Sequence, residues 1–315
     1  MLCIICLLFL AGCSTNQNVS QVKSQIYKVS AASQKGFSFP YYLYIPSTIV
    51  TNLGKDIPLI VVPNNTGTTT DDLAIHERRV VRDLDGSTKD LSEESGLPVL
   101  MPVFPRPETQ WQIYTHSLDR DSLLVKDGPL KRLDLQLISM VNDARPFFKS
   151  KGIQLLKKFL INGYSASGTF SNRFPFLHPK LVLGVASGGV NGIPTLPVNK
   201  LNKKELPYPI GTSDIESLTG QSFDFESYQK IPQYIYMGAK DDNDTVPYRD
   251  AWSEEEAKLI KSVLPTRMMP NRWEECISIY KEKKVNATFK TYKKYGHEYN
   301  RKIRRDIAEF FSNLY

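Results

Sequence analysis

The sequence predicts an α/β fold with a doubly wound, mostly parallel sheet. Short apolar runs alternate along the chain with segments that have helical spacing of apolar residues. Several runs are uninterrupted rather than alternating, as expected for parallel strands covered on both faces. The length of 315 residues and a composition in the globular range permit one large domain. We therefore expect one α/β domain over residues 25–315.

The elements of this domain follow from the local patterns. Strands are expected at residues 41–45, 59–62, 99–104, 159–162, 181–186, 234–237 and 287–292. Helices are expected at residues 133–141, 251–263 and 303–311. Residues 191–232 interrupt this alternation and are rich in Pro, Gly and Ser. They predict either a lid or substrate-binding excursion, or a plain surface connection.

The N-terminus has the pattern of an export signal. Residues 1–10 are apolar, too short to span a bilayer, and are followed by small residues. Leu10-Ala11-Gly12-Cys13 resembles a bacterial lipobox, so residues 1–12 would be a lipoprotein signal peptide and Cys13 the lipidated first residue. Because no Lys or Arg precedes the apolar stretch, an ordinary signal peptide or an apolar anchor is the alternative. The polar residues 13–24 predict a tether, which places the domain on the bacterial cell envelope outside the cytoplasm.

The net charge indicates which partners to expect, and the cysteine content indicates whether a disulfide can form. The net charge is +7, with Lys and Arg spread along the chain, and no nucleic-acid module is visible. We expect a solvated basic surface, no nucleic-acid partner and a monomer. If Cys13 is acylated, Cys276 is the only free cysteine of the mature chain, so no intramolecular disulfide can form. Cys276 lies in a helical pattern, which favours a small core residue over a nucleophile.

The strongest chemical signal is a serine between small residues after an apolar run. Gly163-Tyr164-Ser165-Ala166-Ser167 follows the expected strand 159–162, which is the pattern of a sharp strand–turn–helix elbow with an exposed serine. A serine hydroxyl is a weak nucleophile at neutral pH and needs a neighbouring base.

His297 is the expected base, since Gly296-His297 follows the last expected strand and precedes the last helix. Among the other histidines, His178 is expected to make a structural hydrogen bond and His76, which stands among charged residues, to be solvated.

An acidic loop between the serine and the histidine offers the carboxylate that would orient the base. Asp241 stands three residues after Gly238, at the end of an expected strand, and Asp244 is the alternative. The order Ser165, Asp241, His297 agrees with a nucleophile–acid–base arrangement. The same Asp and Asn residues are also compatible with a cation site or a tight turn.

Further residues are candidates for substrate contact. Backbone N–H groups that would stabilise a negatively charged oxygen are expected at Ala166 and at either Asn65 or Thr66, after the strand 59–62. Tyr164 is a candidate substrate contact. His116 lies in the polar segment 111–121, which predicts either a substrate-contacting loop or a structural network of Asp and Arg.

Taken together, these motifs resemble the α/β-hydrolase superfamily and, within it, secreted esterase-like proteins such as polyhydroxybutyrate depolymerase-like and feruloyl-esterase-like members. The resemblance covers about residues 41–315 and rests on the Ser165 elbow, the loop 238–247 and Gly296-His297. It departs from the family pattern at Ser167, where Gly is usual. The resemblance implies acyl transfer from a small or polymeric ester by Ser165, His297 and Asp241, without a metal or organic cofactor.

Two other functions remain compatible with the sequence. One is a serine peptidase of the same fold, although such enzymes usually bring a large extra domain and 315 residues leave no length for it. The other is a surface lipoprotein that keeps the fold for binding only. A complete set of Ser, Asp and His favours catalysis.

Overall fold

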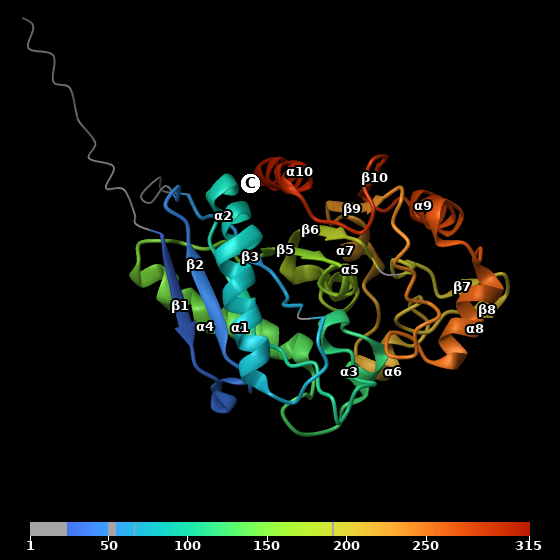
Figure 1. The fold of residues 1–315 in the computed structure, drawn as a ribbon, viewed down its shortest axis with the longest axis horizontal. Coiled ribbons are helices and arrows are strands. Elements are labelled where there is room, and N and C mark those ends of the chain that lie inside the picture. Colours follow the sequence, from blue (N-terminus) through green and yellow to red (C-terminus); the bar gives the residue numbers. More distant parts are fainter. Residues whose placement is uncertain (1–23, 50–54, 66, 191) are drawn as a thin grey trace, which may run out of the picture.

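The computed structural model describes residues 24–49, 55–65, 67–190 and 192–315. Its centre is an eight-stranded sheet with the order β1-β2-β4-β3-β5-β6-β9-β10 (Figure 1). The pairs β1–β2 and β2–β4 are antiparallel, and all later neighbours are parallel, which confirms the expected mostly parallel sheet. The strands are β1 Gln25–Val29, β2 Tyr41–Ile45, β3 Ile60–Val61, β4 Val99–Pro102, β5 Phe159–Tyr164, β6 Val182–Gly188, β9 Gln233–Gly238 and β10 Ala287–Tyr292. A separate hairpin pairs β7 Lys200–Leu201 with β8 Lys204–Glu205.

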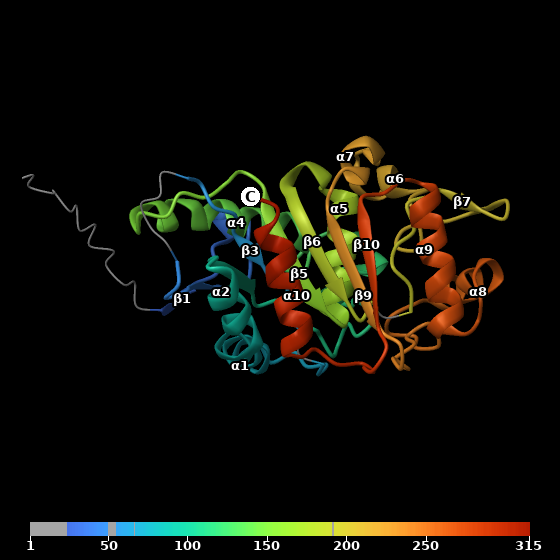
Figure 2. The same cartoon turned by 90° about the horizontal axis from the view of Figure 1, so that it is seen from above.

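Helices cover both faces of the sheet, as Figure 2 shows. One face carries α1, α2 and α10, and the opposite face carries α4 and α5. The helices are α1 Leu73–Asp83, α2 Lys89–Ser95, α3 Arg120–Leu124, α4 Leu133–Ser150, α5 Ala166–Leu177, α6 Ile215–Thr219, α7 Phe225–Gln229, α8 Glu254–Val263, α9 Trp273–Glu282 and α10 Arg301–Ser312. The doubly wound arrangement expected from the alternating patterns is therefore present.

Side-chain caps determine where several helices begin. The Asp72 carboxylate accepts a hydrogen bond from the N–H of Ala74 at the start of α1. Ser253 and Glu256 form a reciprocal capping box at the start of α8. Such caps satisfy N–H groups that have no partner within the helix and are each worth about 1 kcal/mol.

The sequence patterns missed β1, α1 and α2 in the N-terminal part of the domain, and two of these show why. β1 pairs antiparallel with β2, although its side chains are largely exposed and give no apolar run. α1 was not expected because charged residues dominate it and only His76 and Val80 are buried. Both elements lie at the periphery, where tertiary contacts rather than sequence pattern decide the conformation.

Residues 192–232, most of the segment expected to be a lid or substrate-binding excursion or a surface connection, pack onto the rest of the domain. From residue 192 onward, Ile193, Leu196 and Tyr208 are buried in the same core cluster as α4 and α5. The side-chain Oδ1 of Asn172 on α5 accepts a hydrogen bond from the N–H of Thr195 at 2.8 Å. The buried side chains show that this segment is more than a plain surface connection, and its role as a lid or substrate-binding excursion stays a prediction.

Cys276 is fully buried, which confirms the expected core position. Burial raises the pKa of its thiol to about 12, so the thiol is protonated at neutral pH. The signal-peptide and tether predictions, including lipidation of Cys13, fall on residues outside the described part of the chain. Among the residues that the structure describes, no helix is long and apolar enough to cross a bilayer.

A buried charge ties the start of α4 to the end of α5. Asp134 is fully buried and lies 2.8 Å from His178 Nε2 and 2.7 Å from Arg132 Nη2. Burial by itself would raise the pKa of Asp134, but the hydrogen bonds from His178 and Arg132 outweigh it and lower the pKa to about 2. The structural hydrogen bond expected for His178 is thus present.

This network predicts a pH-dependent contribution to stability. Because the pKa of Asp134 is lower in the folded chain than in the unfolded chain, its contribution is complete above about pH 4 and is lost as the pH falls toward 2. We expect Asp134→Asn to lower the free energy of unfolding by about 2 kcal/mol at pH 7 and by less at pH 3. Urea unfolding at both pH values measures the difference. An equal effect at both pH values would contradict the assignment.

Candidate active site

Ser165 stands at the turn between β5 and α5 with φ 61° and ψ −129°. A positive φ is unusual for a residue other than glycine and stores about 1–3 kcal/mol of strain. The N–H of Ser165 donates to the carbonyl of Gly188 on β6 at 2.9 Å, which holds the turn to the neighbouring strand. The predicted strand–turn–helix elbow is therefore present.

Close backbone contacts explain the glycines around this serine. A Cβ atom at Gly163 would lie 2.0 Å from the carbonyl oxygen of Ser167, and one at Gly168 would lie 2.1 Å from the carbonyl oxygen of Gly188. Neither contact is possible for a side chain, so β5, β6 and α5 approach one another this closely only with glycine at both positions.

Ser167, at the position where the resemblance leads one to expect glycine, fits the turn and adds hydrogen bonds. Its Oγ donates to the carbonyl of Tyr164 at 2.8 Å and accepts from the N–H of the same residue at 3.1 Å. The hydroxyl thus bridges both backbone groups of the residue before Ser165 and fixes the elbow from inside.

His297 lies in the loop after β10, and its Nε2 is 2.9 Å from Ser165 Oγ. Parallel pairing places the ends of β9 and β10 side by side, with Gly238 opposite Tyr292. A Cβ atom at Gly238 would lie 2.2 Å from the carbonyl oxygen of Gly296. The absence of a side chain at Gly238 therefore allows the histidine loop to pack onto the end of β9.

Asp241 completes this chain of contacts. Its Oδ2 lies 2.9 Å from His297 Nδ1, and its Oδ1 accepts from the N–H of Asn243 at 3.0 Å. The Asp241 side chain is 1% exposed, so its hydrogen bond with the Nδ1–H of His297 is shielded from solvent. A proton on Nδ1 leaves the lone pair of Nε2 directed at the Ser165 hydroxyl, the arrangement in which imidazole can take a proton.

Asp244, the alternative acid, does not contact His297 in this structure. It lies 2.8 Å from Arg272 Nη1, and the Arg272 side chain is 1% exposed. The guanidinium also donates to the carbonyls of Pro265 and Thr266. Arg272 and Asp244 therefore anchor the loop that carries Asp241.

Asn243 is a residue of the site that the sequence analysis did not single out. Besides holding Asp241 through its backbone, it places its side-chain Nδ2 3.3 Å from His297 Nε2. Its position two residues after Asp241, where Asn often forms a turn with the preceding acid, is the only signal in the sequence.

The structure describes two of the three candidate N–H donors, Ala166 and Asn65. Ala166 begins α5, and N–H groups in the first turn of a helix have no partner within the helix. Asn65 follows β3, while Thr66 lies outside the described residues. The side chain of Asn64, which the sequence analysis did not consider, bridges the N–H and the carbonyl of Phe104 and pins this loop to the end of β4.

Two histidine expectations are wrong. His76 is not solvated but fully buried, and Thr70 and Arg106 contact its Nε2. His116 is 1% exposed and lies 2.8 Å from the carbonyl of Phe104, so it is not a substrate contact. Burial lowers the pKa of both, that of His116 to about 3, which keeps both rings neutral.

Tyr164 lies beside His297, with 4.9 Å between the ring centroids. Burial raises the pKa of its hydroxyl, which therefore stays protonated at neutral pH. The ring packs against the imidazole and limits its rotation.

The buried charge of Arg272 gives a prediction that separates the acids of the loop. Asp244→Asn leaves Arg272 without its counter-charge, and we expect it to lower the free energy of unfolding by about 3 kcal/mol. Asp242→Asn is the matched control, because Asp242 is exposed in the same loop, and its effect should stay within about 0.5 kcal/mol. Chemical denaturation of both variants measures this, and equal losses would refute the anchoring role.

No protein-family model matches the sequence, and no curated protein matches it. Solved structures are similar over most of the chain. Poly(aspartic acid) hydrolase-1 from Sphingomonas sp. KT-1 has 14% identity and a TM-score of 0.57, over 92% of this chain and 97% of that one. A poly(3-hydroxybutyrate) depolymerase from Bordetella parapertussis has 15% identity and a TM-score of 0.56, over 93% and 89%.

An S-formylglutathione hydrolase from Agrobacterium tumefaciens has 13% identity and a TM-score of 0.51, over 92% of this chain and 95% of that one. Likeness at such low identity concerns the arrangement of the backbone and not the substrate. Together with the strand order around β5, these structures show that the chain has the α/β-hydrolase fold.

Proposed function

We propose that the protein is a serine hydrolase that cleaves carboxylic esters through an acyl-enzyme. The observation that carries this proposal is the chain of contacts from Asp241 through His297 to Ser165, with 2.9 Å at each step. The names of the similar structures, which are hydrolases and a depolymerase, agree with it.

In the proposed reaction, Ser165 Oγ bonds to the ester carbonyl carbon while its proton passes to His297 Nε2. Asp241 keeps the other ring proton on Nδ1 and stabilises the imidazolium. The N–H of Ala166 and a second donor at Asn65 or Thr66 would stabilise the negatively charged oxygen.

The tetrahedral intermediate then loses the alcohol, which takes the proton from His297. Water repeats the sequence: His297 accepts a proton from the water as it attacks, the bond between Oγ and the acyl carbon breaks, and the proton returns to Ser165.

Variants of the nucleophile and the acids test these roles. We expect Ser165→Ala to abolish labelling by a fluorophosphonate probe and to reduce hydrolysis of p-nitrophenyl acetate to background. Asp241→Asn should lower kcat by about 10³ to 10⁴-fold, because it removes the acceptor that fixes the imidazole tautomer.

Asp244→Asn serves as the comparison, and per folded molecule it should lose less than about tenfold. Wild type that is not labelled, or undiminished labelling of Ser165→Ala, would refute the proposal. Cleavage of peptide anilides in preference to p-nitrophenyl esters would show that the protein is a peptidase and not an esterase.

We further propose that the hydrolase domain is exported and anchored by a lipid on Cys13. The support is the apolar stretch of residues 1–10 followed by the lipobox-like Leu10-Ala11-Gly12-Cys13. In a bacterial host, labelled palmitate should be incorporated into the wild type and not into Cys13→Ser. Palmitate on the Cys13→Ser variant, or none on the wild type, would count against the anchor.

A further inference from the structure

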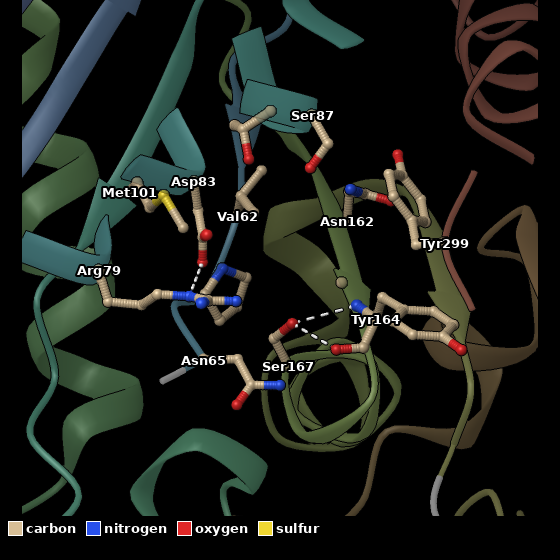
Figure 3. Close-up of a pocket in the computed structure, with 13 residues that line it drawn as sticks. Val62, Asn65, Arg79, Asp83, Ser87, Met101, Asn162, Tyr164, Ser167 and Tyr299 are labelled. Atoms are coloured by element: carbon tan, nitrogen blue, oxygen red, sulfur yellow. Dashed lines mark hydrogen bonds and ion pairs between the residues drawn. The ribbon is translucent and has the colours of Figure 1, made fainter. Parts of the chain in front are cut away.

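A polar pocket lies beside the elbow, on the face of the sheet that carries α1. It has a volume of about 200 Å³ and lies between the ends of β3 and β5 and the residues that join α1 to α2 (Figure 3). Gly163, Tyr164 and Ser167, which flank Ser165, form one wall, and Asn65 forms another. Ser165 itself does not line the pocket, but residues on both sides of it in the sequence do, so the pocket adjoins the elbow.

Arg79 is the cation in the described lining of the pocket, and the Asp83 carboxylate balances its charge. Arg79 extends from α1 toward the centre of the pocket (Figure 3). Its Nε donates to Asp83 Oδ2 at 2.9 Å, and Asp83 lines the pocket as well. Among the described residues, neither Nη group of Arg79 has a hydrogen bond, so both remain available to a ligand.

Neutral polar groups complete the lining. Ser87 and Thr88 contribute hydroxyls from the segment Leu84–Thr88. Asn162, at the end of β5, is 6% exposed, and its Oδ1 has no hydrogen-bond partner among the described residues. The amide also hydrogen-bonds to the hydroxyl of Tyr299, which lines the pocket too, so Oδ1 is the atom of Asn162 left open to a ligand.

This combination of groups selects against charged and against purely apolar ligands. A carboxylate on Arg79 would lie next to the carboxylate of Asp83, and an ammonium group would lie next to the guanidinium. An alkyl chain would remove water from the Arg79 guanidinium and the Asn162 amide without replacing their hydrogen bonds, which disfavours its binding. A hydroxyl both donates and accepts, and can satisfy Asp83 and Arg79 at once.

We propose that this pocket binds an uncharged, hydroxyl-bearing part of the substrate, so that the enzyme prefers hydroxylated esters. The inference rests on the proposed hydrolase function and adds the substrate class. A volume of about 200 Å³ suits a small polar group of the substrate. The hydroxyls belong either to the acyl part or to the alcohol part of the ester.

Two matched pairs of esters distinguish these sources. Methyl 3-hydroxybutyrate against methyl butyrate places the hydroxyl in the acyl part. Glyceryl monobutyrate against propyl butyrate places it in the alcohol part. We expect kcat/KM to be about tenfold or more higher for the hydroxylated member of one pair, because a site that hydrogen-bonds a hydroxyl rejects the analogue without it. Monomethyl succinate, which carries a carboxylate, should not exceed methyl butyrate.

Variants of α1 connect the preference to the pocket. Arg79→Met keeps an unbranched apolar stem and removes the guanidinium, and the ratio within the preferred pair should fall to about one. The variant should fold, because a partly exposed ion pair contributes little to stability. Arg82→Met is the matched control: Arg82 is on the same helix, 67% exposed and 4.0 Å from Asp83, but does not line the pocket. It should keep the wild-type ratio.

The inference is overturned if neither pair differs by more than about twofold, if monomethyl succinate is the best substrate, or if Arg79→Met keeps the preference. Hydrolysis of p-nitrophenyl acetate, whose acetyl group needs no pocket, reports separately on the proposed function. Turnover of this ester without a hydroxyl preference removes only the inference, whereas the absence of all ester hydrolysis removes both.

Discussion

The backbone of Ser165, with φ 61°, is the constraint on which the site depends. A strained residue keeps its conformation only when its surroundings fix it from several sides. Here β5 pairs with β3 and β6 at the centre of the sheet, and α5, which begins directly after the serine, is buried along its length. The close backbone contacts at Gly163 and Gly168 and the hydrogen bonds of the Ser167 hydroxyl then fix the backbone of the turn at Ser165. The Ser165 hydroxyl is thus positioned by rigid elements rather than by a loop.

His297 and Asp241, in contrast, lie in loops and need other means of immobilisation. The contact between Gly238 and Gly296 presses the histidine loop onto the end of β9. The acidic loop is held from its other end by the Asp244–Arg272 pair. If the loop moved away, the buried Arg272 guanidinium would lose its counter-charge, and the free energy of the folded chain would rise. The buried ion pair therefore holds the acidic loop in place, as close backbone packing holds the elbow.

The sequence was sufficient where the relevant interactions are local. The elbow could be predicted because Gly163, Ser165 and Gly168 act within a few residues of one another, and the uninterrupted apolar runs predicted the parallel strands. The choice between Asp241 and Asp244 could not be made in this way, because Arg272, the partner of Asp244, follows 28 residues later. The burial of His76 likewise depends on contacts with Arg106, in a different part of the chain.

The same dependence on distant contacts limited what could be predicted for residues 191–232. Frequent Pro, Gly and Ser residues are compatible with a mobile excursion, and only the position of α5 beside this segment shows that its apolar side chains are enclosed. The composition of a segment indicates how flexible its backbone is, whereas the burial of its side chains depends on which other elements of the fold pack against it.

The pocket beside the elbow shares its wall with the groups that fix Ser165. Ser167 closes the turn through Tyr164 and also lines the pocket, and Asn162 belongs to the strand that ends in the elbow. In the proposed enzyme, a hydroxyl bound at this wall would be positioned relative to Ser165 by β5 itself and not by a flexible loop. Binding at such a site restricts the orientation of the ester carbonyl as well as its affinity, so a lost hydrogen bond affects the rate of acyl transfer and not only KM. Selectivity for a hydroxylated ester and reactivity of the serine would then depend on one rigid element.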